Sequence, residues 1–149
     1  DHFWKLAEDS IPTGEIVEVE GTVFDLRHGR TISEVLQSND PQITLVGNGF
    51  DHPFLLKEGE QPQIILSEEN SGRKLSIETN EPCVVVYTGN NIDDKTMMAG
   101  GERTYKYCAL CLETQGAPDA IHHENFPSIV LEPGEAYYSF TKYRFGTDE

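Results

Sequence analysis

The stretch 63-QIILSEENSGRKLSIET-79 decides which fold class is expected for this chain. Two short runs rich in apolar residues flank the turn sequence ENSGR, a pattern typical of an antiparallel β-hairpin. In the second run the side chains alternate, with Leu75, Ile77 and Thr79 on one face and Lys74, Ser76 and Glu78 on the other. Because successive side chains of a strand point to opposite faces, the pattern predicts one buried and one solvated face.

Most of the remaining chain also reads as short strands separated by turn signals. The segments expected to be strands are HFWKL (2–6), EIVEVEGTVFDL (15–26, after a PTG turn), QITLV (42–46), FDHPFLL (50–56), CVVVYTG (83–89), YKYCALCLETQ (105–115) and YYSFTKYRF (137–145). The only helix candidate is TISEVLQS (31–38), with Thr31 as a possible N-cap. We therefore expect an all-β protein, an antiparallel sandwich or barrel, forming a single domain over residues 1–149.

Charge and composition narrow the possible partners. The chain has 149 residues and a formal net charge of −15, with 11 Lys and Arg against 26 Asp and Glu. Such a surface repels phosphate backbones and anionic lipid, so nucleic acid and membranes are not expected partners. No apolar run approaches the length of a membrane helix, there is no signal-peptide pattern, and three cysteines are too few for a disulfide framework. These features favour a cytoplasmic location.

Three pairs of metal-ligating or reactive residues have simpler explanations. Cys108 and Cys111 form a lone CxxC, but residues three apart in a strand face opposite ways, so packing in the core is expected. The adjacent pair His122-His123 is expected to be a solvated loop pair, since neighbouring side chains diverge. Asp93-Asp94 lacks the spacing of an EF-hand loop. No metal site is predicted.

Two carboxylates are harder to explain as surface charge. Asp51 lies between Phe50 and Phe54, where a polar group in apolar surroundings needs a hydrogen-bond partner. Glu113 interrupts the apolar run CALCL at the end of an expected strand. A turn-capping Asp and a surface Glu are the alternatives, and in either case a substitution would have little effect.

The order of several motifs resembles the back half of the aldose 1-epimerases, the galactose mutarotases. These motifs are SIPTGEIVEVEGTVFDLR, NGFDHPFLL, SGRKLSIETNEPCVVVYTGN and CLETQGAPDAIHHENFPSIVLEPGEAYYSFTKYRF, and they cover nearly the whole chain. The resemblance implies a large antiparallel β-sandwich enzyme that interconverts the α and β anomers of free hexoses such as galactose and glucose, with no cofactor. It implies that Glu113 is the general base and that Asp51 binds sugar hydroxyls.

Two departures from the family pattern qualify this expectation. The position two residues before the tyrosine of Y-T-G-N is a sugar-contacting glutamine in many family members, but here it is Val85. The catalytic acid of the family is a histidine in an upstream N-H-x-Y-F-N-L motif that this sequence lacks. We therefore expect the chain to be the C-terminal part of a larger mutarotase sandwich, with the missing N-terminal half as its partner. The alternative is a mutarotase-like domain that binds carbohydrate or regulates without catalysis.

Overall fold

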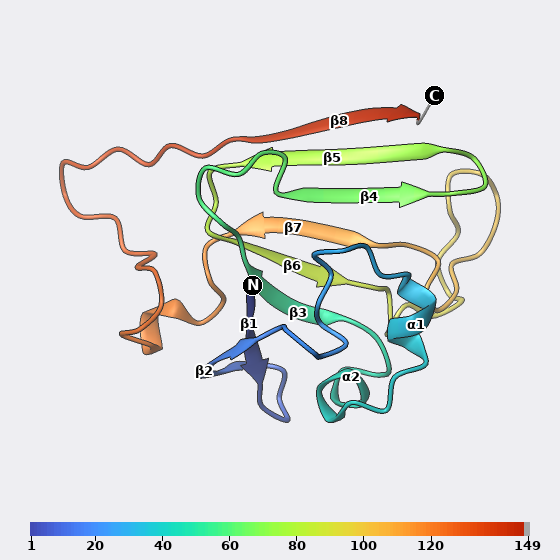
Figure 1. Ribbon diagram of the computed structural model, residues 1–149, viewed down its shortest axis with the longest axis horizontal. Helices are drawn as coiled ribbons and strands as arrows, with labels where there is room; N and C mark the ends of the chain where they lie inside the picture. Colours follow the sequence, from blue (N-terminus) through green and yellow to red (C-terminus); the bar gives the residue numbers. More distant parts are fainter. Residues whose placement is uncertain (148–149) are drawn as a thin grey trace.

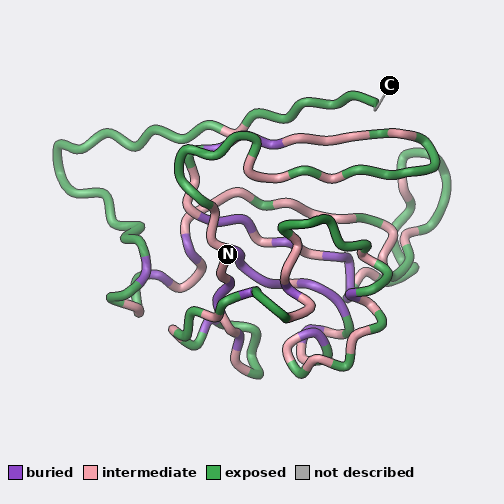
Figure 2. The backbone as a smooth tube through the Cα atoms, viewed as in Figure 1, coloured by how far each residue is buried: buried purple, intermediate pink, exposed green. Residues whose placement is uncertain are grey.

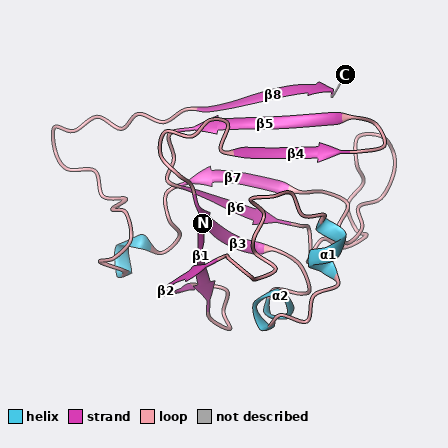
Figure 3. Cartoon of the chain, viewed as in Figure 1, coloured by secondary structure: helices cyan, strands magenta, loops and turns pink. Residues whose placement is uncertain are grey.

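Two antiparallel sheets form the framework of the computed structural model, which describes residues 1–147 (Figure 1). The larger sheet has the strand order β2-β1-β3-β6-β7 and the smaller has the order β4-β5-β8. The strands are β1 (His2–Leu6), β2 (Pro12–Glu18), β3 (Asp51–Leu55), β4 (Ile64–Glu68), β5 (Arg73–Thr79), β6 (Cys83–Tyr87), β7 (Cys111–Gln115) and β8 (Thr141–Thr147). The helical segments are α1 (Ile32–Leu36), α2 (Pro41–Leu45) and the 3₁₀ turn η1 (Ala120–His122) (Figure 3). The expected all-β, antiparallel architecture is confirmed.

The hairpin from which the fold class was predicted is present as β4 and β5, with Leu66 paired to Leu75 and Ile64 to Ile77. Strand β8 adds to the other edge of β5, so that Ile77 also pairs with Tyr143. The two sheets are linked by hydroxyls, because Thr141 Oγ1 lies 2.6 Å from Thr114 Oγ1 on β7 and 3.1 Å from Thr79 Oγ1 on β5. The alternating pattern of the sequence thus gives this sheet one face directed towards the larger sheet.

An aromatic core covers one face of the larger sheet. The rings of Phe3 and Phe24 stack with centroids 3.9 Å apart, and Phe50 and Phe54 pack edge-to-face. Valines of β6 and the buried residues Val35 of α1 and Ile43 of α2 complete the cluster. Figure 2 shows that burial is concentrated along β1, β3 and β6, whereas the chain leading into β8 is exposed.

Several expected strands are shorter than predicted or are replaced by other structures. QITLV is helical, because Asp40 caps the backbone N–H of Gln42 at 2.8 Å and Pro41 occupies the first turn, where proline is tolerated. PTG lies inside β2, where Gly14 has a positive φ of 89° beside the ring of His123. The expected helix with its Thr31 cap is confirmed as α1, and Glu34 completes a capping box.

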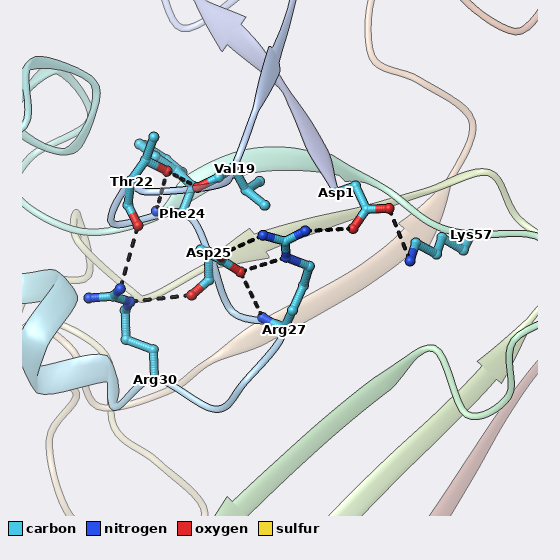
Figure 4. Close-up of polar contacts among 8 residues, drawn as sticks. All are labelled: Asp1, Val19, Thr22, Phe24, Asp25, Arg27, Arg30 and Lys57. Carbon is cyan, nitrogen blue, oxygen red and sulfur yellow. Dashed lines mark hydrogen bonds and ion pairs between the residues drawn. The ribbon is translucent and has the colours of Figure 1, made fainter.

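The segment TVFDL forms a polar turn in place of a strand (Figure 4). Thr22 Oγ1 donates to Val19 O and accepts from the N–H of Phe24, and the Arg27 guanidinium bonds both Asp25 and Asp1. Such side-chain bonds to nearby groups compete with strand pairing. The Arg27 hydrogen bond holds the pKa of Asp25 below its usual value. The turn presents Phe24 to the core.

The N-terminal parts of two other expected strands, residues 105–110 and 137–140, also lie outside the sheets. In residues 105–110, Tyr107 adopts a positive φ of 66° and its hydroxyl donates to Asn48 O at 2.6 Å, so the strand begins only at Cys111. In residues 137–140, the Asn80 amide group replaces strand pairing by bonding Tyr138 O and the N–H of Phe140. Strand β8 therefore begins at Thr141.

The buried imidazole of His52 links the stability of the fold to pH. Its ring is fully buried among Phe3, Phe24 and Phe50, and burial lowers its pKa from 6.5 to about 3. Its Nδ1 accepts the backbone N–H of Asp51 at 3.2 Å, while its Nε2 has no partner among the described residues. The folded protein therefore keeps this imidazole neutral at pH values where the unfolded chain binds a proton.

We expect the free energy of unfolding to fall by about 2 kcal/mol between pH 7.5 and pH 5.0 because of this one group, since the loss begins at the unfolded pKa and continues down to the folded one. In a His52→Leu variant this part of the pH dependence disappears. Urea unfolding at the two pH values measures it, with the exposed His28→Gln variant as control. An unchanged slope in His52→Leu would show that the imidazole is not buried.

Candidate functional site

The central strand β6 brings the two predicted site carboxylates onto one face of the sheet. Asp51 on β3 pairs with Tyr87 on β6, and Val85, two residues earlier on β6, pairs with Glu113 on β7. Cross-strand partners and residues two apart point to the same face of a sheet. Asp51, Val85 and Glu113 therefore share a face, and the intervening residues His52, Val84, Val86 and Leu112 point to the aromatic core.

The register also determines the spacing of the two carboxylates. They are two strands and two residues apart, which corresponds to roughly 12 Å between Cα atoms at the usual strand spacing and rise. Aspartate and glutamate side chains at this separation can both reach one small ligand that lies between them. The face is thus sized for a ligand that spans β6.

The acidic groups of this face affect one another electrostatically. Burial raises the pKa of Asp51, and the negative charge of Glu113 raises it further. The pKa of the Cys111 thiol is likewise raised by burial and by the charges of Glu113 and Asp51. Asp51 is half-buried and Glu113 is exposed. The two carboxylates lie on opposite sides of β6 on this face.

A buried polar clasp holds the chain immediately before Asp51. Thr88 Oγ1 accepts the N–H of Phe50 at 2.9 Å, and Asn90 Nδ2 donates to Phe50 O at 2.8 Å. Gly49 is required here, since an added Cβ would lie 2.1 Å from Asn90 Oδ1. Reasoning from the sequence missed Thr88 and Asn90 as positioning residues, although both belong to the quoted motif Y-T-G-N and Gly49 to NGFD.

The same face is closed at the far end of the strands. Trp4, Cys83, Ala117, Ala120 and Phe126 form a second buried cluster there, with Leu55 packed against it. The rings of Trp4 and Phe126 lie 4.9 Å apart. This cluster does not include Asp51 or Glu113, which lie on an uncovered part of the sheet.

Two hollows lie elsewhere on the described part of the chain. One has a volume of about 730 Å³ and is bordered by Arg27, Lys57 and Ile65, beside the ion pairs of Figure 4. The other has a volume of about 240 Å³ and is lined by Leu66, Leu75 and Phe145. Neither includes Asp51 or Glu113.

The remaining candidate groups are arranged differently from the predictions. Cys108 and Cys111 are half-buried and not fully packed in the core, because Cys108 lies in the turn before β7. The prediction of a solvated histidine pair is right for His122 only. His123 is half-buried, with its Nε2 3.1 Å from Pro12 O.

Residues 1–147 contain neither a metal site nor a membrane-spanning helix. Asp93 pairs with Lys95 in an exposed loop. In this range no group of three or more Asp, Glu, His or Cys side chains could hold a metal ion. No helix in the same range is both long enough and apolar enough to cross a membrane.

Comparison with known proteins gives consistent similarities. The family model described as aldose 1-epimerase matches residues 1–144. Galactose mutarotase from Rattus norvegicus is 40% identical over 147 residues, which cover 97% of this chain and 41% of the rat protein. Aldose 1-epimerase from Escherichia coli is 31% identical over 150 residues, covering 97% of this chain and 42% of that protein.

Solved structures show the same partial coverage. The galactose 1-epimerase of Lactobacillus acidophilus matches with a TM-score of 0.78 at 30% identity, over 100% of this chain and 42% of its own. A GalM/aldose epimerase homologue from C. elegans matches with a TM-score of 0.82 at 25% identity, over 100% of this chain and 44% of its own. The chain thus spans about two fifths of the length of these relatives.

We expect a Glu113→Gln substitution to lower the pKa of Asp51, because it removes one of the two causes of the rise, while burial keeps that pKa above its ordinary value. The pKa of Cys111 falls in the same variant. Carboxyl carbon shifts followed by NMR titration measure the first effect. The exposed Glu8→Gln substitution is the matched control. An Asp51 pKa that is identical in both variants would place the carboxylates too far apart to share a ligand.

Proposed function

This chain belongs to the aldose 1-epimerase family, and we propose that the protein containing it interconverts the α and β anomers of a free hexose such as galactose or glucose. The observation that carries the proposal is the position of Asp51 and Glu113 on one face of β3, β6 and β7. A hexopyranose lying across β6 can reach both carboxylates.

The chemistry of mutarotation accounts for these two residue types. Glu113, as general base, removes the proton from the anomeric hydroxyl while the ring oxygen takes up a proton, so the C1–O5 bond breaks and an aldehyde forms. Rotation about C1–C2 and reclosure on the other face of the carbonyl, with both proton transfers reversed, give the other anomer. Asp51 accepts hydrogen bonds from sugar hydroxyls and so positions C1 over Glu113. The reaction needs no cofactor, because the aldose supplies its own carbonyl group.

We assign the general acid to a part of the protein outside this chain. His52 follows Asp51 in sequence but points into the aromatic core, and its pKa of about 3 leaves it without a proton to donate at neutral pH. The open face at Asp51 and Glu113 leaves room for further groups to close over the sugar. The relatives are more than twice as long as the aligned region, which supports this assignment.

We assign the exposed apolar side chains of the smaller sheet to contact with that same additional part. Phe145 is 81% exposed and Tyr143 is 47% exposed, on the face of β8 that continues from buried Ile77. Phe145 also borders the hollow beside Leu66 and Leu75. A monomer seldom exposes a contiguous apolar surface of this kind, so we expect a further layer of the family sandwich to cover it.

A second candidate function is binding of carbohydrate without catalysis. The observation that favours it is Val85, an aliphatic residue that lies between the two carboxylates and cannot bond a sugar hydroxyl. In that case the intact protein would bind hexoses without accelerating their interconversion.

We expect Glu113→Gln in the intact protein to lower kcat/KM for mutarotation by about 10²-fold or more, because the amide cannot accept the anomeric proton. Glu8→Gln leaves the rate unchanged. Polarimetry of freshly dissolved α-galactose measures both. Equal rates in the wild type and Glu113→Gln would remove Glu113 from the role of base, and saturable sugar binding with no rate enhancement in the wild type would favour the binding function.

We expect residues 1–149 expressed alone to self-associate as their concentration rises, because no segment within residues 1–147 covers the exposed side chains of Tyr143 and Phe145. Phe145→Ser shifts the sedimentation profile towards the monomer. Ile121→Ser, at a position that is 68% exposed in the 3₁₀ turn, serves as the control and has no such effect. A wild-type chain that stays monomeric at high concentration would show that the surface needs no cover.

A further inference from the structure

The surface between Asp51 and Glu113 is apolar. Val85 lies directly opposite Glu113 on β6, and Pro53, on the other side of Val85, is buried. Together with Tyr87 and Cys111 in the neighbouring row, these residues make the surface on which any ligand bridging the two carboxylates must lie. A ligand that bridges the site would contact the carboxylates of Asp51 and Glu113 at its two ends and the aliphatic side chain of Val85 between them.

The backbone supplies no substitute for a polar side chain at this point. Residue 85 lies in the middle of β6, which pairs with β3 on one side and β7 on the other, so its backbone groups face neighbouring strands. The Tyr87 hydroxyl accepts the N–H of Asn91, a residue that lies beyond the end of β6, at 3.1 Å. A ligand hydroxyl that faces Val85 would lose its water without gaining a partner from the side chain or backbone of that residue, whereas a C–H group would make a favourable contact.

We propose that Val85 is a specificity-determining residue that makes this protein favour hexoses carrying hydrogen, not a hydroxyl, on the carbon that lies over it, that is, a monodeoxyhexose. The inference rests on the proposed function, because it assumes that a sugar bridges Asp51 and Glu113. The preference originates in the cost of burying one unsatisfied sugar hydroxyl.

Threonine is the most informative substitution at this position. Val85→Thr keeps the β-branched shape and replaces one methyl group with a hydroxyl, so it changes hydrogen bonding with little change of shape. Val85→Ala removes bulk without adding a polar atom and is the matched control. Since Val85 is only half-buried at the surface of the sheet, neither substitution disturbs the aromatic core on the opposite face.

The experiment measures kcat/KM for mutarotation by the intact protein with galactose and with its 2-, 3-, 4- and 6-deoxy analogues. Each variant-to-wild-type ratio is taken for the same sugar, so differences in intrinsic ring-opening rate cancel. In the wild type we expect one analogue to react at least as well as galactose. In Val85→Thr we expect the preference to shift back towards galactose by about two- to tenfold for that analogue alone, the range of one hydrogen bond. Val85→Ala should leave the order of the sugars unchanged.

The outcomes separate this inference from the function on which it rests. If all four analogues react more slowly than galactose in the wild type and Val85→Thr alters every sugar equally, the role of Val85 is overturned while the epimerase function stands. If no sugar is interconverted faster than in buffer, or if Glu113→Gln reacts as fast as the wild type, the proposed function itself fails.

Discussion

The antiparallel register of β3, β6 and β7 is the constraint on which the rest of the structure depends. Side chains alternate strictly along a strand, so a slip of one residue would turn Asp51 or Glu113 into the core and expose an apolar residue in its place. The slip is opposed from both faces, because Phe54, Val84 and Val86 are buried on one side and Cys83 on the other. The clasp of Thr88 and Asn90 around Phe50 fixes where β3 begins.

One sheet thus separates two environments. The aromatic face keeps His52 neutral, while the opposite face carries two carboxylates around an apolar centre. Burial and mutual repulsion raise the pKa of Asp51, which is the usual result of placing acidic groups close together in partly desolvated surroundings. The smaller sheet, with Phe145 and Tyr143 exposed, gives the chain a second apolar surface.

Local patterns in the sequence were enough to predict the elements whose signals are local. The β4–β5 hairpin, the buried strand CVVVY and the capping box of α1 each follow from neighbouring residues. The prediction of a strand at QITLV was wrong because the Asp40-Pro41 helix start outweighs the β-branched residues that follow. The prediction of a strand at TVFDL was wrong because the side chains of Thr22 and Asp25 form hydrogen bonds with nearby groups, and no strand within residues 1–147 pairs with this segment.

Local sequence patterns could not predict the site itself. Asp51 and Glu113 are far apart in sequence, and only the pairing of both strands with β6 brings them onto one face. Their proposed roles came from the resemblance of NGFD and CLETQ to the epimerase motifs, and family membership is confirmed. The clasp by Thr88 and Asn90 depends on contacts between loops that no periodic pattern reveals.

The most direct test is a crystal structure of the intact protein with galactose bound. The account predicts one sugar ring lying over Val85, with an Asp51 oxygen within hydrogen-bond distance of a ring hydroxyl and a Glu113 oxygen within the same distance of the anomeric hydroxyl. A galactose that binds away from β6, or that touches one carboxylate while the other remains in solvent, would contradict it.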